Sequence, residues 1–197
     1  WYDKVEHVTL VDIDPAMTTL GTSFSLLASL NEHSYEDPRL ELVHKDALVW
    51  LGGCKRSFDI VIIDFPDPSS FSVGKLYTTA FYRRLAACLS PEAVVAIQCT
   101  APLTAPKSYW CVVKTLETAG LHVLPYRAGV PSFGEWGFVL AASSKLAPPT
   151  SLQLPESSRS KIRFLDDTTL QGMFQLPHDM RPPEVEPNRW DNQILVR

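Results

Sequence analysis

Short apolar runs that lead into aspartate recur in the first third of the chain. These runs, with the acids that end or follow them, are residues 5–13 with Asp12 and Asp14, residues 40–44 with Asp46, and residues 58–63 (FDIVII) with Asp64. A continuous apolar run rich in β-branched residues is typical of a strand buried on both faces, as in a parallel sheet. The pattern therefore predicts buried parallel strands that deliver carboxylates at their carboxyl ends.

Segments with helical spacing separate these runs. We expect helices over residues 16–30, 47–51, 78–89 and 109–119, a loop over residues 65–74, and further strands over residues 94–98, 121–126 and 136–142. Strands that alternate with helices predict an α/β fold, a doubly wound and mostly parallel sheet of the Rossmann-like kind. The last strand follows a short loop rather than a helix, so we expect it to run antiparallel to its neighbour.

The chain changes character beyond Lys145, where seven of its 16 prolines lie. Proline lacks a backbone donor and fixes its own φ, so this stretch is unsuited to long helices or central strands. We expect a domain over residues 1–146 and, over residues 147–197, a tail that lies on the domain or on a neighbouring subunit. A short helix is predicted over residues 166–174, capped by Asp166 or Asp167. The expected anchors of the tail are Phe164, Leu165, Met173, Phe174 and Trp190.

The charge and the cysteines exclude several classes of function. The 197 residues carry a formal net charge of -4, which implies no surface for polyanions, so we expect no nucleic-acid partner. A cationic small molecule fits this charge better. The four cysteines (Cys54, Cys88, Cys99 and Cys111) show no metal-binding spacing, so we expect reduced thiols and no metal, with a metal or disulfide framework as the alternative.

No apolar stretch approaches the ~20 residues that span a bilayer. We therefore expect no membrane contact from this segment and a cytoplasmic location, with the cytoplasmic domain of a longer membrane-anchored protein as an alternative. The chain begins at Trp1 without Met and runs almost at once into a strand, so we expect the natural start to lie upstream.

The acids gather where ligands bind in open α/β sheets, at the carboxyl ends of the strands. Each acid also has a structural interpretation: Asp14 and Asp46 are placed to cap helices, and Asp67-Pro68 forms a turn dipeptide. Their recurrence at one edge favours a site. Asp64 and Asp67 stand three residues apart in a proline-containing loop, and such a pair of carboxylates can hold a cationic substrate and take a proton from it.

Several segments of the chain resemble the polyamine aminopropyltransferases, the spermidine synthase family, and in particular a bacterial branch with an N-terminal multi-span membrane region. The segments are VTLVDIDP, PRLELVHKDA, FDIVIIDFPDPSSFSVGKLYTTAFY, VPSFGEWGFVLA and, in the tail, RFLDDTTLQGMFQLPHDM and NRWDNQILVR. The most specific element is the D-x-x-D-P loop followed by L-Y and F-Y. The resemblance covers essentially the whole chain and implies a sheet of the methyltransferase type.

The resemblance implies transfer of an aminopropyl group from decarboxylated S-adenosylmethionine to a polyamine acceptor such as putrescine, which gives spermidine and methylthioadenosine. No permanently bound cofactor is implied. Asp12 matches the acid that holds the ribose of the donor, and Asp46 matches the acid that contacts its adenine. Asp64 matches the general base, Asp67 its partner in holding the amine, and Tyr77 falls beside the donor or acceptor pocket.

Phe133 and Trp136 are candidates to line the channel for the methylene chain, with core packing as the alternative. Many soluble family members carry Tyr where Phe133 stands, so a hydroxyl group that contacts the amine is absent at this position.

The family's glycine-rich motif, G-G-G-D-G, does not occur in the chain, and we expect it and the first strand of the sheet to lie upstream of Trp1. A sheet without its first strand leaves an exposed strand edge, so we expect a homo-oligomer. Two other functions remain open: an S-adenosylmethionine-dependent methyltransferase on the same fold, and a non-catalytic binding module.

Overall fold

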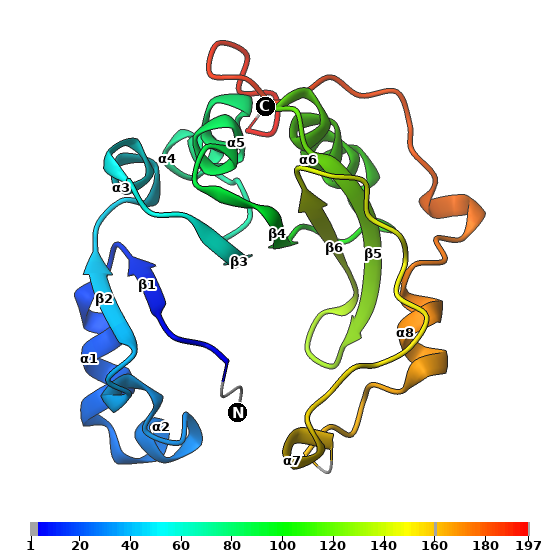
Figure 1. The fold of residues 1–197 in the computed structure, drawn as a ribbon. Coiled ribbons are helices and arrows are strands. Elements are labelled where there is room, and N and C mark those ends of the chain that lie inside the picture. The colour runs from blue at the N-terminus through cyan, green and yellow to red at the C-terminus, as the bar shows by residue number, and fades with distance from the viewer. Residues whose placement is uncertain (1–3, 160, 197) are drawn as a thin grey trace.

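The computed structural model describes residues 4–159 and 161–196, and its strands form two separately hydrogen-bonded groups (Figure 1). In the first group, β1 (Val8–Asp12) pairs in parallel with β2 (Leu40–His44). The second group has the order β3-β4-β6-β5, formed by β3 (Phe58–Ile63), β4 (Leu89–Gln98), β5 (His122–Val130) and β6 (Gly134–Ala142). The predicted sheet is therefore present in two pieces.

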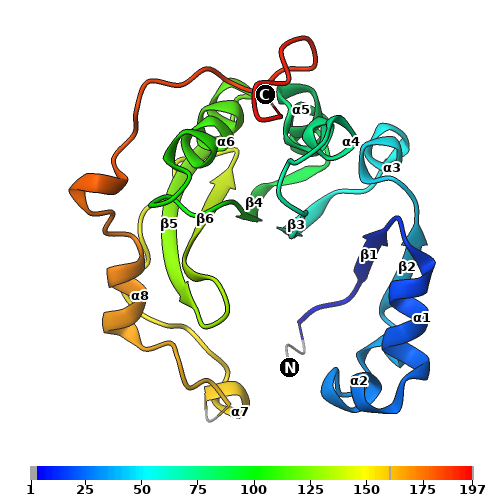
Figure 2. The same cartoon turned by 180° about the vertical axis from the view of Figure 1, so that it is seen from behind.

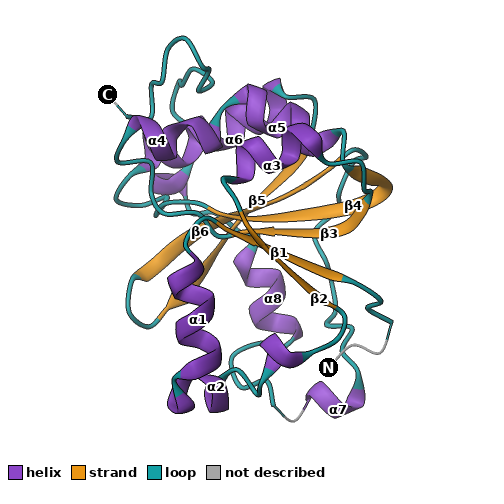
Figure 3. Cartoon of the chain, turned by 90° about the vertical axis from the view of Figure 1, so that its left-hand side faces the viewer, coloured by secondary structure: helices purple, strands orange, loops and turns teal. Residues whose placement is uncertain are grey.

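Helices cover both faces of these strands, as a doubly wound fold requires (Figure 3). On one side lie α3 (Ala47–Gly53), α4 (Phe71–Gly74), α5 (Thr79–Ala86) and α6 (Pro106–Thr118). On the other side lie α1 (Pro15–Ser23), α2 (Ser25–Leu30), α7 (Glu156–Arg159) and α8 (Asp167–Met173). Short 3-10 turns are η1 (Ser34–Glu36), η2 (Lys75–Tyr77) and η3 (His178–Met180).

The predicted strand directions are confirmed. β3 and β4 run parallel, whereas β6 runs antiparallel to both β4 and β5. The hairpin of β5 and β6 continues beyond the end of β4, because Gln98, the last residue of β4, pairs with Phe138 in the middle of β6. The tip of the hairpin therefore projects at the edge where β3 and β4 end.

Several predicted boundaries are wrong. Residues 16–30 form two helices rather than one, because Phe24 takes an extended conformation (φ −85°, ψ 110°) between α1 and α2. Gly52 and Gly53 belong to α3 instead of halting it, and α4 with η2 occupies part of the stretch expected to be a loop. β1 is shorter than residues 5–13, and β4 begins at Leu89 rather than Val94.

The hydrophobic core lies where α5 and α6 cover β3, β4 and β6. Its fully buried aromatic side chains are Tyr77, Phe81, Tyr82 and Tyr109, and aliphatic residues from the strands fill the spaces between them. Cys88, Cys99 and Cys111 are buried thiols, and no cysteine among the described residues is bonded in a disulfide. The core thus supports the end of β3, where Asp64 follows.

The facing edges of β1 and β3 are unpaired among the described residues, because β1 bonds only to β2 and β3 only to β4. Apolar side chains on these strands are exposed, including Val8 (44%), Ile60 (70%) and Ile62 (77%). Such exposure is unusual for strands with the FDIVII pattern of a buried sheet. Both exposed strands therefore border the gap between the two hydrogen-bonded groups.

The tail crosses the surface of the domain and ends beside α5 and α6 (Figures 1 and 2). The Phe174 ring packs on Tyr126 of β5, with ring centroids 5.2 Å apart, as expected of an anchor. Phe164 and Trp190 are 57% and 59% exposed, so their prediction as anchors is wrong. Asp166 accepts a hydrogen bond from Thr169 N at 2.7 Å, which confirms it as the cap of α8.

Two polar contacts tie the last part of the tail to the domain instead. The Trp110 indole Nε1 donates to the Met180 carbonyl oxygen at 2.9 Å, and the fully buried Asn188 bonds to residues of both α5 and α6. Among the residues that the structure describes, no helix has the length and apolar character needed to cross a membrane.

Candidate active site

The strands place three of the predicted acids at one edge of the fold. Asp12 ends β1, Asp46 follows β2, and Asp64 follows β3 directly. The ends of β1 and β2 are neighbours, because Lys45 N donates to the Asp12 carbonyl oxygen at 3.1 Å. This is the edge at which ligands bind in open α/β sheets.

The backbone of the loop that carries Asp64 and Asp67 is held in place by hydrogen bonds from Tyr77. The Tyr77 hydroxyl shares a hydrogen bond between the carbonyl oxygens of Phe65 (3.2 Å) and Pro66 (3.1 Å). The Phe65 ring also packs edge-on against Tyr77, with centroids 6.1 Å apart. The backbone between the two aspartates is therefore fixed by a side chain that is itself 1% exposed.

The two carboxylates of this loop remain available to a ligand. Asp64 and Asp67 are exposed, and neither side chain forms a hydrogen bond within residues 4–159 and 161–196. Cys99 directly follows β4. Burial raises the pKa of its thiol, and the charge of Asp67 raises this pKa further, so Asp67 lies near the end of β4. The two aspartates thus lie on one loop whose backbone Tyr77 fixes, and both carboxylates are exposed.

Burial raises the pKa of Tyr77 far above its ordinary value, and the charges of Cys99, Asp67 and Asp64 raise it further. The phenol therefore stays protonated near neutral pH. A group that keeps its proton donates a hydrogen bond but does not exchange a proton with a substrate. In this structure the Tyr77 hydroxyl is therefore a hydrogen-bond donor to the loop between Asp64 and Asp67.

Asp46 is engaged on both carboxylate oxygens. Oδ1 caps α3 by accepting from Leu48 N (2.9 Å) and Val49 N (3.3 Å), and Oδ2 pairs with Lys75 Nζ at 2.5 Å. Burial acts to raise the pKa of Asp46, but the hydrogen bonds from Lys75 and from the Val49 and Leu48 amides outweigh it, so the pKa is lowered. Asp46 is thus an ionised, fixed acceptor linked through Lys75 to the turn that holds Tyr77.

Asp14 and Asp46 cap helices, as predicted, and both also lie at the carboxyl edge of the strands. Asp14 Oδ1 accepts from Ala16 N at 2.8 Å as the cap of α1, and Asp46 caps α3 in the same way. The Asp12 side chain accepts from Asp14 N at 2.8 Å and is half-buried. Each carboxylate oxygen has two lone pairs, so Asp12, Asp14 and the Oδ2 atom of Asp46 keep acceptor capacity for a ligand.

Phe133 and Trp136 lie at the tip of the hairpin of β5 and β6. Their rings face each other with centroids 5.1 Å apart. Phe133 is 67% exposed, so core packing does not explain it, whereas Trp136 is half-buried. The hairpin brings both to the edge of the acids, but the described contacts connect neither ring to Asp64 or Asp67.

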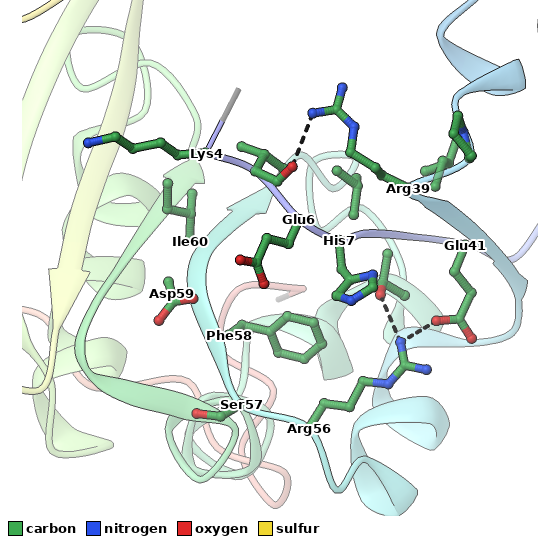
Figure 4. A pocket seen from close by; sticks show the side chains of 15 residues that line it. Lys4, Glu6, His7, Arg39, Glu41, Arg56, Ser57, Phe58, Asp59 and Ile60 are labelled. Atoms are coloured by element: carbon green, nitrogen blue, oxygen red, sulfur yellow. Dashed lines mark hydrogen bonds and ion pairs between the residues drawn. The ribbon is translucent and has the colours of Figure 1, made fainter. Parts of the chain in front are cut away.

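A cavity of about 890 Å³ lies at the other end of the strands, between β1, β2 and β3 (Figure 4). Residues at the starts of these strands line it, and Arg56 reaches across to Glu41 and to the Thr9 hydroxyl. The cavity borders the unpaired edges of β1 and β3. It is therefore a feature of the divided sheet and is distinct from the acids at the carboxyl ends.

Two residues of this region were not identified from the sequence. Lys75 lies inside the G-K-L-Y segment, two residues before Tyr77, but its partner Asp46 lies 29 residues earlier in the chain, and no sequence pattern links the two. Asn188 lies 111 residues beyond Tyr77 and bonds to its carbonyl oxygen, and no sequence pattern links the two.

Comparisons with known proteins show the family to which the chain is similar. The family model described as "Spermine/spermidine synthase domain" matches residues 1–153. The chain is 50% identical over 198 residues to polyamine aminopropyltransferase 2 of Ralstonia nicotianae, with 100% of this chain and 38% of that protein covered. It is 43% identical over 196 residues to the polyamine aminopropyltransferase of Leptospira interrogans, with the same coverage. The chain thus spans well under half the length of these curated relatives.

Solved structures show the same fold at low sequence identity. The spermidine synthase of Thermotoga maritima superposes with a TM-score of 0.70 at 18% identity, covering 89% of this chain and 59% of that one. A spermidine synthase in complex with the transition-state analogue AdoDATO gives a TM-score of 0.71 at 20% identity, with 89% and 60% covered. The expected Rossmann-like fold of the methyltransferase type is confirmed by these matches. By its family match and by the identity of its relatives, the chain belongs to the spermine/spermidine synthase family.

Proposed function

We propose that the protein transfers an aminopropyl group from decarboxylated S-adenosylmethionine to a polyamine such as putrescine, giving spermidine and methylthioadenosine. The observation that carries the proposal is the pair of free carboxylates, Asp64 and Asp67, on a loop fixed by Tyr77 at the carboxyl edge of the strands. The names of the relatives, polyamine aminopropyltransferases, support the same reaction class. We also propose a cytoplasmic site of action and a homo-oligomeric assembly.

In the proposed reaction the amine nitrogen attacks the carbon bonded to the donor's sulfonium. The N–C bond forms as the C–S bond breaks, and the sulfur leaves as the neutral thioether of methylthioadenosine. The attacking nitrogen must lose a proton, because a free amine is protonated near pH 7. A carboxylate within hydrogen-bond reach takes that proton. We assign this role to Asp64, and we assign to Asp67 the positioning of the amine for in-line attack.

The donor is proposed to lie across the ends of β1 and β2. Asp12 would accept from the ribose hydroxyls, as an acid at the end of a strand does in nucleotide-binding folds. Asp46, ionised and fixed by Lys75 and the start of α3, would accept from the adenine amine. Phe133 and Trp136 would flank the methylene chain of the acceptor from the hairpin. No permanently bound cofactor takes part in this scheme.

The substitution Asp67→Asn distinguishes aminopropyl transfer from the alternative function, methyl transfer. We expect Asp67→Asn to lower kcat/KM for the amine by about 10- to 100-fold, because it removes a charge-assisted hydrogen bond to an ammonium group. Methyl transfer has no need of a second acid in this loop and is expected to be unaffected. The measurement is steady-state kinetics of the full-length gene product with each donor in turn.

The control for this experiment is Asp179→Asn, which makes the same change at an exposed position in η3 of the tail. It is expected to leave kcat/KM unchanged. Methylation of an acceptor by S-adenosylmethionine, without any aminopropyl transfer in the unaltered protein, would overturn the proposed function.

A further inference from the structure

The tail inserts one fully buried polar side chain, Asn188, between α6 and the turn that precedes α5. Its backbone is bonded on both sides: Asn188 N donates to Thr115 Oγ1 at 2.8 Å, and Thr79 N donates to the Asn188 carbonyl oxygen at 3.0 Å. These bonds join the tail to α6 and to the first turn of α5. Asn188 therefore lies in the interior, although Glu186 and Trp190, two residues away on either side, are exposed.

Both donors and the oxygen of the Asn188 side-chain amide form hydrogen bonds. Nδ2 donates to the carbonyl oxygens of Gly74 (3.1 Å) and Tyr77 (3.2 Å), and Oδ1 accepts from Leu195 N at 3.4 Å. Two donors and an acceptor in this arrangement suit an amide and no other side chain of this size. Without the amide, two buried carbonyl oxygens would lose their partner, which is costly.

Gly74 directly precedes η2 and Tyr77 is its last residue, and this turn reaches both halves of the candidate site. Lys75 of this turn pairs with Asp46, and the Tyr77 hydroxyl holds the carbonyl oxygens of the loop between Asp64 and Asp67. One amide from the end of the chain thus fixes the backbone from which both supporting side chains extend. A shift of this turn moves Tyr77, and with it the carboxylates of the loop.

We propose that Asn188 is a positioning residue of the active site, through which the C-terminal tail sets the geometry of the acidic loop. The role rests on the proposed function. Asn188 does not contact the substrates. It holds the backbone of the turn that carries Lys75 and Tyr77, and these two side chains support the acids of the site. The tail is accordingly a required part of the site, although it lies outside the region that carries the predicted catalytic acids.

The test is a double-mutant cycle with Asn188→Ala and Tyr77→Phe in the full-length gene product. We expect Asn188→Ala to raise KM for the amine by about tenfold, the scale set by buried carbonyl groups left without partners. In the Tyr77→Phe background the same change is expected to raise KM by less than about threefold, because residues that act through one another are not additive. If Asn188→Ala does not fold, Asn188→Ser replaces it, since the shorter side chain does not span both carbonyl oxygens.

Trp110→Phe is the matched control, because it also removes one hydrogen bond between the tail and the domain. The bond it removes runs from the Trp110 indole to the Met180 carbonyl oxygen and involves neither Gly74 nor Tyr77. Hydrogen exchange of residues 71–82 gives a readout that does not depend on activity. We expect faster exchange and a raised KM in Asn188→Ala but not in Trp110→Phe. Equal changes of KM in both variants, or additive effects in the cycle, would overturn the role of Asn188 alone. An unaltered protein that transfers no aminopropyl group would overturn the proposed function itself.

Discussion

Asparagine in place of Asp64 is expected to lower kcat for aminopropyl transfer by about 10²- to 10⁴-fold, the range of general base catalysis. The amide is close in size to the carboxylate but does not take a proton from the attacking amine. Asp64 is exposed and forms no hydrogen bond with the described residues, so its replacement should leave the fold intact. The measurement is kcat at saturating donor and amine in the full-length gene product.

The control variant is Asp59→Asn, in the same strand β3 but near its opposite end. Asp59 is exposed and accepts a hydrogen bond from Ser90 Oγ at 2.7 Å. Asp59→Asn therefore makes the same chemical change as Asp64→Asn, at the end of β3 that is remote from the site. We expect Asp59→Asn to change kcat less than about twofold. The defect of Asp64→Asn should also narrow as the pH rises toward the pKa of the amine, about 10, because more of the amine is already neutral. A kcat within about threefold of the unaltered protein near pH 7 would exclude Asp64 as the base.

Gly137→Ala is expected to lower the free energy of unfolding by about 3 kcal/mol, the upper part of the range for overpacked cores. Gly137 is a buried residue of β6, and a Cβ built on it would lie 2.6 Å from the Thr100 carbonyl oxygen and closer still to the Tyr109 ring. That ring has no free path away, because its hydroxyl bonds to the Phe138 carbonyl oxygen at 3.0 Å and to the Tyr126 carbonyl oxygen at 3.3 Å. Either the strand or α6 must therefore shift. Denaturant unfolding followed by fluorescence measures the loss.

Gly172→Ala is the matched control for this substitution. Gly172 lies in α8, has no positive φ, and would place a new Cβ in open space. Alanine is the better helix former, so this variant is expected to gain about 0.4–1 kcal/mol. Losses of equal size in the two variants would contradict the account of the contact between β6 and α6.

The strands and their acids were predictable because one short sequence pattern, an apolar run followed by aspartate, indicates both. FDIVII followed by aspartate predicts a strand and the position of its carboxylate, and the structure places β3 and Asp64 accordingly. The burial expected on both faces of this strand is not found, because Ile60 and Ile62 are exposed beside the unpaired edge. The break at Phe24 was not predictable, because the apolar spacing of the segment continues through it and only the backbone conformation divides α1 from α2. Periodicity reports which face is buried, and it does not report where a helix bends.

The tail shows the same limit for long-range contacts. Hydrophobicity selected Phe164 and Trp190 as anchors, yet both are mostly exposed, and the buried anchor is the polar Asn188. A buried asparagine requires partners, and here these are backbone groups distant in the sequence, the carbonyl oxygens of Gly74 and Tyr77. Backbone partners leave no trace in the identity of the residues, so the sequence alone does not reveal them. The pairing of Lys75 with Asp46 joins two side chains that lie 29 residues apart, and no local pattern connects the two positions.

Product analysis of the full-length gene product tests the central claim most directly. The protein is incubated with decarboxylated S-adenosylmethionine and a panel of diamines and triamines, and in parallel with S-adenosylmethionine, and the products are identified by mass spectrometry. The account predicts an aminopropylated amine and methylthioadenosine in equal amounts from the first donor, with loss of both products in Asp64→Asn. A methylated acceptor from the second donor, with no aminopropylated amine from the first, would contradict it.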